Sequence, residues 1–285
     1  MSFVQALING LLLGGVYGVI SSGLSLVFGV LGVVNFAHAE FMMLGMYVAW
    51  YAWRIFGIDP LAGSIVAAIS IGALGYILEK SLLQRVLRGP PAAQISLTVG
   101  LMIILENAAL VAFGTEFRTV TTIYQNAGLE FGQLYVGAPY IVAFAAAVAI
   151  AILLWLYLSR SWMGRAIRAT SQDPMAATIV GVDTRQVYGL TFALGVGLTA
   201  MGGAIILPYL SVSPAAGQQF AVLMFTVVVL GGLGSVAGAL VGGVIVGIVQ
   251  SMSTLMFPTH LQNLILFIIF IAMLAFRPQG LLKER

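Results

Sequence analysis

Long runs of apolar residues, separated by short polar interruptions, make up most of this chain. A helix needs about 20 apolar residues to cross the hydrocarbon core of a bilayer. Nine runs approach or exceed this length, and they cover residues 4–28, 35–53, 62–86, 93–113, 137–158, 187–209, 219–232, 235–256 and 261–276. The run at 219–232 is short for a full crossing. We therefore predict an all-α fold, a polytopic integral membrane bundle of 8–9 membrane segments in a single domain over residues 1–285.

The composition agrees with a membrane protein and excludes several other classes. Hydrophobic residues make up 61% of the chain and charged residues only 7%, whereas soluble domains carry roughly 25% charged residues. The absence of cysteine excludes disulfides and thiolate chemistry. The net charge of +3 does not indicate nucleic-acid binding, because the basic residues lie in short loops between the runs. Residues 1–28 lack the basic start of a cleavable signal peptide, so we expect them to stay in the membrane.

The distribution of the basic residues predicts an orientation. Ten of the twelve Lys and Arg residues lie in three interruptions of the apolar pattern, and they are Lys80, Arg85, Arg88, Arg160, Arg165, Arg168, Arg185, Arg277, Lys283 and Arg285. Short loops rich in Lys and Arg stay on the cytoplasmic side of a membrane. With nine segments, the N-terminus is then outside and the C-terminus is in the cytoplasm.

Two glycine-rich stretches have the same spacing. Gly29-Val-Leu-Gly32 and Gly231-Gly232-Leu-Gly234 are offset by about 202 residues, and Gly45 and Gly247 repeat that offset. One interpretation is a two-half internal repeat, with broken helices at matching positions near a substrate path. The other is chance in a chain with 34 glycines, most of which we expect to allow close helix packing.

Few polar residues lie within the apolar runs. Asn35, His38 and Glu40 follow the first glycine stretch, and Glu106 lies in the fourth run. The first group either lines a translocation path or satisfies backbone groups at a helix break near the cytoplasmic interface. Gly231, Gly232 and Gly234 mark a second candidate for a translocation path or a helix break. The spacing of His and carboxylate residues fits no metal site, and neither a catalytic motif nor a phosphate-binding loop is present. We expect no cofactor in this chain.

The longest polar interruption, residues 159–186, contains signals for two short helices. Asp173 and Pro174 are typical of a helix start, and Gly181 is placed to end that helix. Met175 and Ile179 share one face of it, as Arg165 and Arg168 do in the preceding stretch. Two interpretations fit: a loop held to anionic lipid headgroups, or a pair of helices that dock into a groove on a cytosolic protein.

Several motifs resemble those of one known family. They are Asn-Phe-Ala-His-Ala-Glu at 35–40, Ser-Trp-Met-Gly-Arg-Ala-Ile-Arg-Ala at 161–169, Asp-Pro-Met-Ala-Ala at 173–177, Val-Leu-Gly-Gly-Leu-Gly-Ser-Val-Ala-Gly-Ala-Leu-Val-Gly-Gly at 229–243 and Arg-Pro-Gln-Gly-Leu at 277–281. In this order they resemble the LivH-type permeases of bacterial branched-chain amino acid ABC importers. Ala39 departs from the family pattern, which commonly has glycine there.

The resemblance implies a location in the bacterial inner membrane and a set of partners. These are a related permease subunit in a heterodimer, two cytosolic ABC ATPase subunits, a periplasmic substrate-binding protein, membrane lipid and the amino-acid substrate. It also implies that the loop at 159–186 is a cytoplasmic coupling loop that contacts an ATPase. The implied coupling residues are Gly164, Arg165, Arg168, Asp173, Pro174, Met175, Ala176 and Gly181.

We therefore expect a permease subunit that conducts branched-chain amino acids and is not itself an enzyme. An importer of the same family for another amino acid, an amide or urea is an alternative. Two further interpretations are a proton-coupled secondary transporter using Glu40 or Glu106, and an intramembrane enzyme using His38.

Overall fold

The computed structural model describes residues 2–87, 89–132, 134–257, 262–277 and 279–282. Of the basic residues used to predict the orientation, Arg88, Lys283 and Arg285 lie outside the described residues. The elements in chain order are α1 (Ser2–Leu31), α2 (His38–Phe56), α3 (Pro60–Leu78), the π-helical turn η1 (Glu79–Leu83), α4 (Gln84–Val86), α5 (Pro91–Phe113), β1 (Gly128–Phe131), β2 (Leu134–Gly137), α6 (Ala138–Arg160), α7 (Trp162–Gln172), α8 (Pro174–Ile179), α9 (Thr184–Ile206), α10 (Ala216–Gly231), α11 (Val236–Met256) and α12 (Gln262–Phe276).

Each of the nine predicted apolar runs contains a helix, and the predicted membrane helical bundle is confirmed. Within the described ranges, six helices are long and apolar enough to cross a membrane: α1, α3 with its continuation to Val86, α5, α6, α9 and α11. α10 and α12 are shorter apolar helices. The number of crossings and the internal repeat stay predictions.

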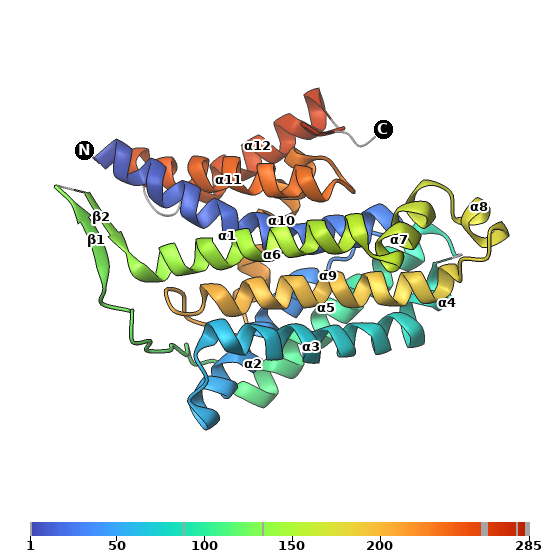
Figure 1. The fold of residues 1–285 in the computed structure, drawn as a ribbon, viewed down its shortest axis with the longest axis horizontal. Helices are drawn as coiled ribbons and strands as arrows, with labels where there is room; N and C mark the ends of the chain where they lie inside the picture. The colour runs from blue at the N-terminus through green and yellow to red at the C-terminus, as the bar shows by residue number, and fades with distance from the viewer. Residues whose placement is uncertain (1, 88, 133, 258–261, 278, 283–285) are drawn as a thin grey trace.

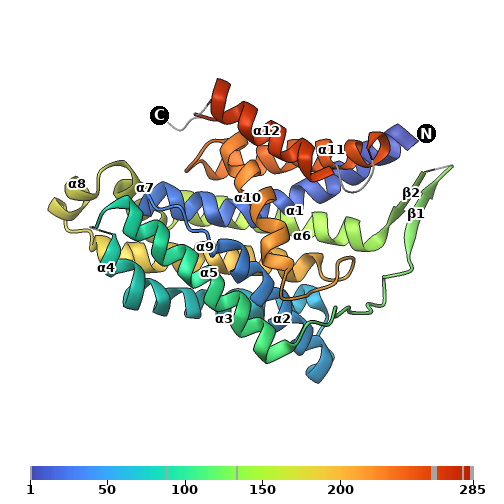
Figure 2. The ribbon, with the colours of Figure 1, turned by 180° about the vertical axis from the view of Figure 1, so that it is seen from behind.

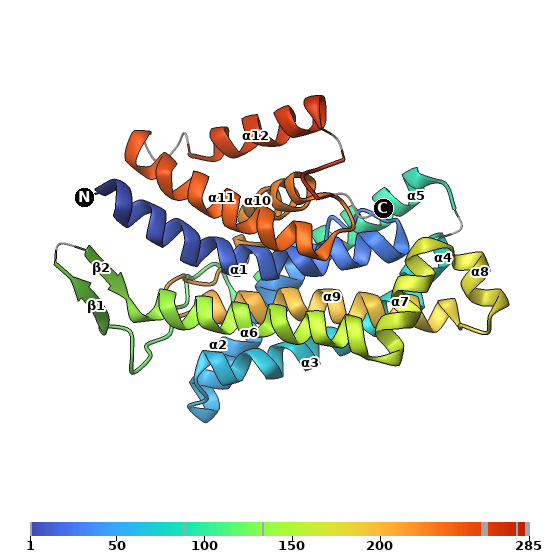
Figure 3. The ribbon, with the colours of Figure 1, turned by 45° about the horizontal axis from the view of Figure 1, so that its top comes forward.

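The two helices α1 and α9 form the centre of the bundle. Most positions of both are buried, whereas α5 and α6 leave most of their surface uncovered. α1 lies against α11 and α6 as well as α9, and α2 and α3 pack on the other side of α9 (Figures 1 and 3). The main core therefore lies between α1, α2 and α9, around large side chains such as Phe41 and Phe192.

Glycine explains how closely α1 and α11 approach each other. A Cβ atom on Gly14 would lie 2.6 Å from Cα of Val244, and one on Gly10 would lie 2.7 Å from Cα of Ile248. Any larger residue at these positions would force the two backbones apart. Lipid tails are as apolar as the side chains of membrane helices, so the hydrophobic effect does not drive these helices together. Close backbone packing of this kind is therefore a main source of attraction between them.

One end of the bundle carries a β-hairpin that the all-α prediction did not include. β1 and β2 pair antiparallel, from Gly128 opposite Gly137 to Phe131 opposite Leu134. The Gln5 side chain binds the edge of this hairpin twice, because its Nε2 donates to the Tyr135 carbonyl at 2.6 Å and its Oε1 accepts from the Tyr135 N–H at 3.0 Å. The N-terminus and the hairpin therefore lie at the same end (Figure 1).

The opposite end gathers basic segments that are far apart in sequence. Lys80 donates to the Arg185 carbonyl at 3.3 Å, and Gln84 donates to the same oxygen at 3.0 Å. These contacts join the end of the third apolar run to the start of α9. Helices α7 and α8 project from this same end, far from the N-terminus (Figures 1 and 3).

Candidate functional site

Helix α7 begins at a tight corner after α6. The Ser161 side chain accepts a hydrogen bond from the Gly164 N–H at 2.8 Å and so caps the start of α7. Gly164 lies directly against the carbonyl of Leu158, where a Cβ atom would collide with the α6 backbone. The glycine is therefore needed for α7 to fold back on α6. Ile167, on the inner face of α7, is 2% exposed and packs with residues of α1 and α9.

The two arginines predicted to mediate coupling bind the end of α6. Arg165 donates from Nη1 to the Arg160 carbonyl at 3.2 Å, and Arg168 donates from Nη1 to the Leu158 carbonyl. The last four carbonyls of a helix lack partners within the helix, and basic side chains are favourable at that end. Arg165 and Arg168 therefore hold the α6–α7 corner together, although both are exposed to solvent.

Helix α8 has the boundaries that its sequence predicts. Asp173 accepts hydrogen bonds from the N–H groups of Met175 at 2.8 Å and Ala176 at 3.0 Å, and Pro174 is the first helical residue. The helix ends at Ile179, and Gly181 follows with a φ of +92° that favours glycine. Asp183 caps α9 in the same way. The predicted start and end of α8 are confirmed.

The surface of α8 is unusually apolar for a segment outside the membrane helices. Met175, Ile179 and Val180 are 76%, 79% and 77% exposed, whereas Ala177 on the opposite side is buried. Apolar residues grouped on an exposed polar segment are typical of a contact surface. We call Met175, Ile179 and Val180 the α8 face. The sequence indicated Met175 and Ile179 through their spacing but not Val180, which follows the last helical residue.

The second region of interest is the break between α1 and α2. The chain turns at Gly32, whose φ is +67°, and runs without helical structure to His38. The Asn35 Oδ1 atom accepts a hydrogen bond from the Ala37 N–H at 3.1 Å, which stabilises this irregular backbone. Asn35 and His38 are both buried.

A chain of hydrogen bonds crosses from this break to two other helices. Thr199 on α9 donates its hydroxyl proton to the Ile20 carbonyl at 2.8 Å. Its oxygen, 2.8 Å from Nε2 of His38, must therefore accept from an Nε2–H group. The Asn35 amide nitrogen, which can only donate, lies 3.4 Å from Nδ1 of His38, so Nδ1 is the acceptor. The ring is thus neutral and connects the break to α1 and α9.

The hydrogen bond to Thr199 places this break inside the bundle. Its position near the cytoplasmic interface stays a prediction. Thr199 is about 22 Å along α9 from Thr184, at 1.5 Å per residue. Residues 32–37 connect α1 to α2 without helical structure. The hydrogen bonds account for Asn35 and His38 as packing groups. A transport role for them stays a prediction.

Glu40 lies one half-turn further along α2 and is equally buried. Its carboxylate presses against Gly217 at the start of α10, where a Cβ atom would collide with it. Its Oε2 atom has no hydrogen-bond partner among the described residues. Glu106 on α5 is half-buried and close enough for its charge to act on Glu40. Within the described part of the chain, no three His, Asp or Glu side chains are placed to hold a metal ion.

The two glycine-rich stretches lie against each other. A Cβ atom on Gly29 would be 2.9 Å from the Gly234 carbonyl oxygen. Gly232 and Gly234 have φ values of +114° and +90°, and they form the turn between α10 and α11 that follows Gly231. The glycines are therefore required by local backbone geometry. Their contact does not test the internal repeat.

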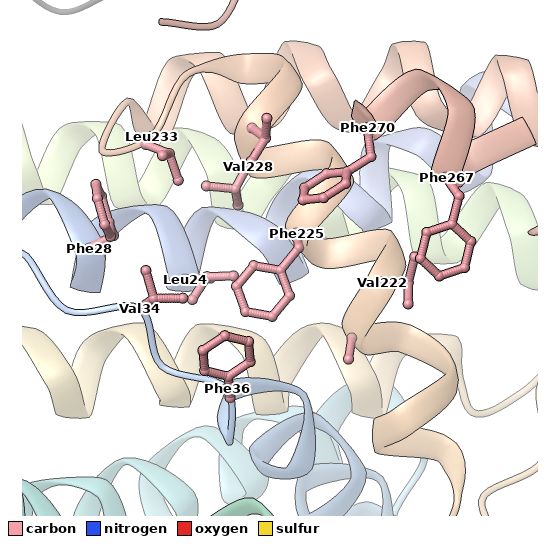
Figure 4. A pocket seen from close by; sticks show the side chains of 12 residues that line it. Leu24, Phe28, Val34, Phe36, Val222, Phe225, Val228, Leu233, Phe267 and Phe270 are labelled. Carbon is pink, nitrogen blue, oxygen red and sulfur yellow. The ribbon is translucent and has the colours of Figure 1, made fainter. Parts of the chain in front are cut away.

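An apolar cavity of about 410 Å³ lies between α1, the segment 32–37, α10 and α12 (Figure 4). Its lining is entirely of apolar residues, and the aromatic ones are Phe28, Phe36, Phe225, Phe267 and Phe270. The rings of Phe36 and Phe225 are 5.4 Å apart between centroids. We call this space the phenylalanine cavity.

Sequence reasoning missed the partners of the buried polar groups. Thr199 and Gly217 are 161 and 177 residues distant from His38 and Glu40 in sequence, respectively. Nothing in local spacing links positions so far apart. The phenylalanine cavity was missed for the same reason, because its lining comes from four separate segments.

Comparison with known proteins places the chain among transport proteins. A family model described as "Branched-chain amino acid transport system / permease component" matches residues 6–274. The high-affinity branched-chain amino acid transport system permease protein BraD of Pseudomonas aeruginosa is 29% identical over 294 residues, which cover 98% of this chain and 95% of BraD. The corresponding permease protein LivH of Escherichia coli K12 is 30% identical over 303 residues, with 98% and 95% covered.

A solved structure shares the fold. PsaBC from Streptococcus pneumoniae, determined in complex with Fab, contains a chain that matches with a TM-score of 0.54 and 14% identity. The match covers 98% of this chain and 93% of that chain. At this identity the likeness shows a common helical architecture and nothing about substrate.

Proposed function

Because this chain belongs to the permease-component family of branched-chain amino acid transport systems, we propose that it is the membrane-spanning permease subunit of an ATP-driven importer that carries branched-chain amino acids across a bacterial inner membrane. The observation that carries this proposal is the family match over residues 6–274, nearly the whole bundle. The chain conducts the substrate and makes or breaks no bond. ATP is hydrolysed on separate subunits.

The proposal extends to the partners. A related permease completes the membrane part, two cytosolic ATPases supply energy and a periplasmic binding protein delivers the amino acid. The single permease domain spans residues 1–285, and residues 159–186 form its coupling loop. The exposed apolar α8 face supports this assignment, since a helix that transmits force needs a surface that packs on its partner. Gly164, Arg165, Arg168, Asp173, Pro174 and Gly181 then hold α7 and α8 in place for that contact.

The proposed orientation has nine crossings, with the N-terminus outside and the C-terminus in the cytoplasm. Helices α7 and α8 leave the bundle at the end opposite to the N-terminus (Figures 1 and 3). The contacts of Lys80 and Gln84 with the Arg185 carbonyl bring two basic segments together at the α8 end. Both features agree with a cytoplasmic α8 end.

Uptake by proteoliposomes tests the proposal. The complete complex with its cognate ATPases, loaded with ATP on the side of the α8 end and supplied with binding protein outside, is expected to accumulate labelled leucine, isoleucine and valine. Collapse of a proton gradient should leave the rate unchanged. Uptake that needs no ATPase subunit and follows an imposed proton gradient would overturn the importer assignment. Uptake of urea or an amide in place of aliphatic amino acids would reassign the substrate.

A further inference from the structure

Two acidic side chains, Glu40 and Glu106, lie close to each other on α2 and α5. Glu40 on α2 is 1% exposed, and its Oε2 atom has no hydrogen-bond partner in the described part of the chain. Glu106 on α5 is half-buried, and it is the charged group that acts on Glu40. An ionisable group at membrane depth pairs with a partner or faces a water-filled path. A positively charged group from outside the described chain would therefore meet two carboxyl groups here.

The surroundings of this pair suit an aqueous path better than lipid. α5 and α10 both pack against α2, and they lie on the same face of the bundle (Figure 2). α5 leaves most of its surface uncovered. Gln218 and Gln219, next to the glycine that faces Glu40, are exposed at the start of α10. Exposing polar side chains such as these to hydrocarbon costs free energy, so they favour contact with water.

The phenylalanine cavity begins one helical turn away. Ala221 lines this cavity and lies four residues after Gly217, which is about 6 Å along α10. Phe36 lines it as well and precedes Glu40 by four residues. The cavity volume of about 410 Å³ lies within the range of about 300–1,000 Å³ for small-molecule sites. The carboxyl groups thus lie close in sequence and along the helices to the apolar lining that Figure 4 shows.

We propose that these two parts form a transit site for the substrate, in which Glu40 and Glu106 hold its ammonium group and the phenylalanine cavity receives its aliphatic side chain. The inference rests on the proposed function and specifies where this subunit meets the amino acid. A branched-chain amino acid carries both groups on one carbon atom, so it matches the adjacent polar and apolar parts. A lipid chain or a partner helix would fill the cavity but would leave the carboxylates without a cation.

Uptake of leucine and alanine by the complete reconstituted complex tests the site. Glu106→Gln removes the charge at constant shape, and both substrates should then enter about tenfold more slowly, the equivalent of one charge-assisted hydrogen bond. Val222→Phe fills the cavity, and leucine uptake should fall about tenfold while alanine uptake stays within about twofold of the unmodified complex. Matched controls are Glu116→Gln in the loop after α5 and Val241→Phe on the exposed side of α11, and both should transport normally.

The outcomes separate the site from the proposed function. Absence of leucine uptake by the unmodified complex would refute the importer assignment itself. Normal leucine and alanine uptake by Glu106→Gln, in a complex that does transport leucine, overturns the ammonium contact alone. Equal slowing of both substrates by Val222→Phe assigns the cavity to lipid or packing and overturns the side-chain contact. Dissociation of the Val222→Phe complex on gel filtration identifies the cavity as a subunit contact, which also overturns it.

Discussion

The break between α1 and α2 and the α8 face are opposite in character. At the break, the polar side chains of Asn35 and His38 are buried in a membrane bundle. On α8, the apolar side chains of Met175 and Ile179 are exposed at the end of that bundle. The Thr199 hydroxyl provides a hydrogen-bond partner for His38 at the break. Such a partner is needed because an unpaired polar group in hydrocarbon costs several kcal/mol of free energy. The α8 face has no such cover, so its partner is expected to be another chain.

The largest effect should come from placing charge on the α8 face. Met175→Asp combined with Ile179→Asp is expected to weaken association with the ATPase subunits by about a thousandfold, because two central interface residues contribute about 2 kcal/mol each. The affinity can be measured by titrating the ATPases onto the permease in nanodiscs.

Ile123→Asp combined with Leu129→Asp is the matched control. It places two aspartates on exposed apolar positions in the segment between α5 and α6, at the hairpin end, and association should be unchanged. Charge reversal at Arg165 and Arg168 is a less specific test, since their guanidinium groups bind α6 carbonyls. Unaltered affinity of the Met175 and Ile179 double variant would assign the α8 face to lipid headgroups instead.

A smaller effect is expected from Gly45→Ala, which tests how closely α2 packs against α9. The new Cβ atom would lie 2.5 Å from Cα of Ala200, so α2 must move away from α9 at a cost of about 1–3 kcal/mol. The measurement is thermal unfolding of the purified protein in detergent. Gly100→Ala in α5 is the control, because no atom lies within 4 Å of its new Cβ. Equal melting temperatures for the two variants would show that α2 is loosely packed.

An effect of the same size is expected from Thr199→Val, which removes one hydroxyl at constant shape. The His38 Nε2–H group loses its acceptor, and the expected loss in unfolding free energy is about 1–3 kcal/mol. Thr226→Val is the control, since that buried hydroxyl binds only the Val222 carbonyl of its own helix at 2.8 Å. If both variants lose the same stability, the connection between the break and α9 contributes nothing beyond an ordinary helix bond.

The same contrast shows what the sequence could predict. The ends of α8 depend on Asp173, Pro174 and Gly181, which act on atoms within a few residues, and these were predictable. The apolar runs likewise predicted the helices, because the thickness of the bilayer core sets how long and how apolar a spanning helix must be.

The interior could not be predicted in this way. The contact of His38 with Thr199 depends on how α1, α2 and α9 pack, and the sequence carries no local signal for it. The β-hairpin was missed because its two short strands depend on pairing with each other and on the Gln5 side chain, 130 residues before Tyr135.

The glycine contact between α1 and α11 has a consequence for synthesis of the chain. α1 leaves the ribosome before the other described helices, and the α11 backbone that fits against Gly14 follows about 230 residues later. At 5–20 residues per second, α1 spends roughly 10–50 s in the bilayer before its glycine surface can be covered. During that time the surface is open to the helices of neighbouring nascent chains. Protection by the insertion machinery would therefore decide how much of the protein assembles correctly.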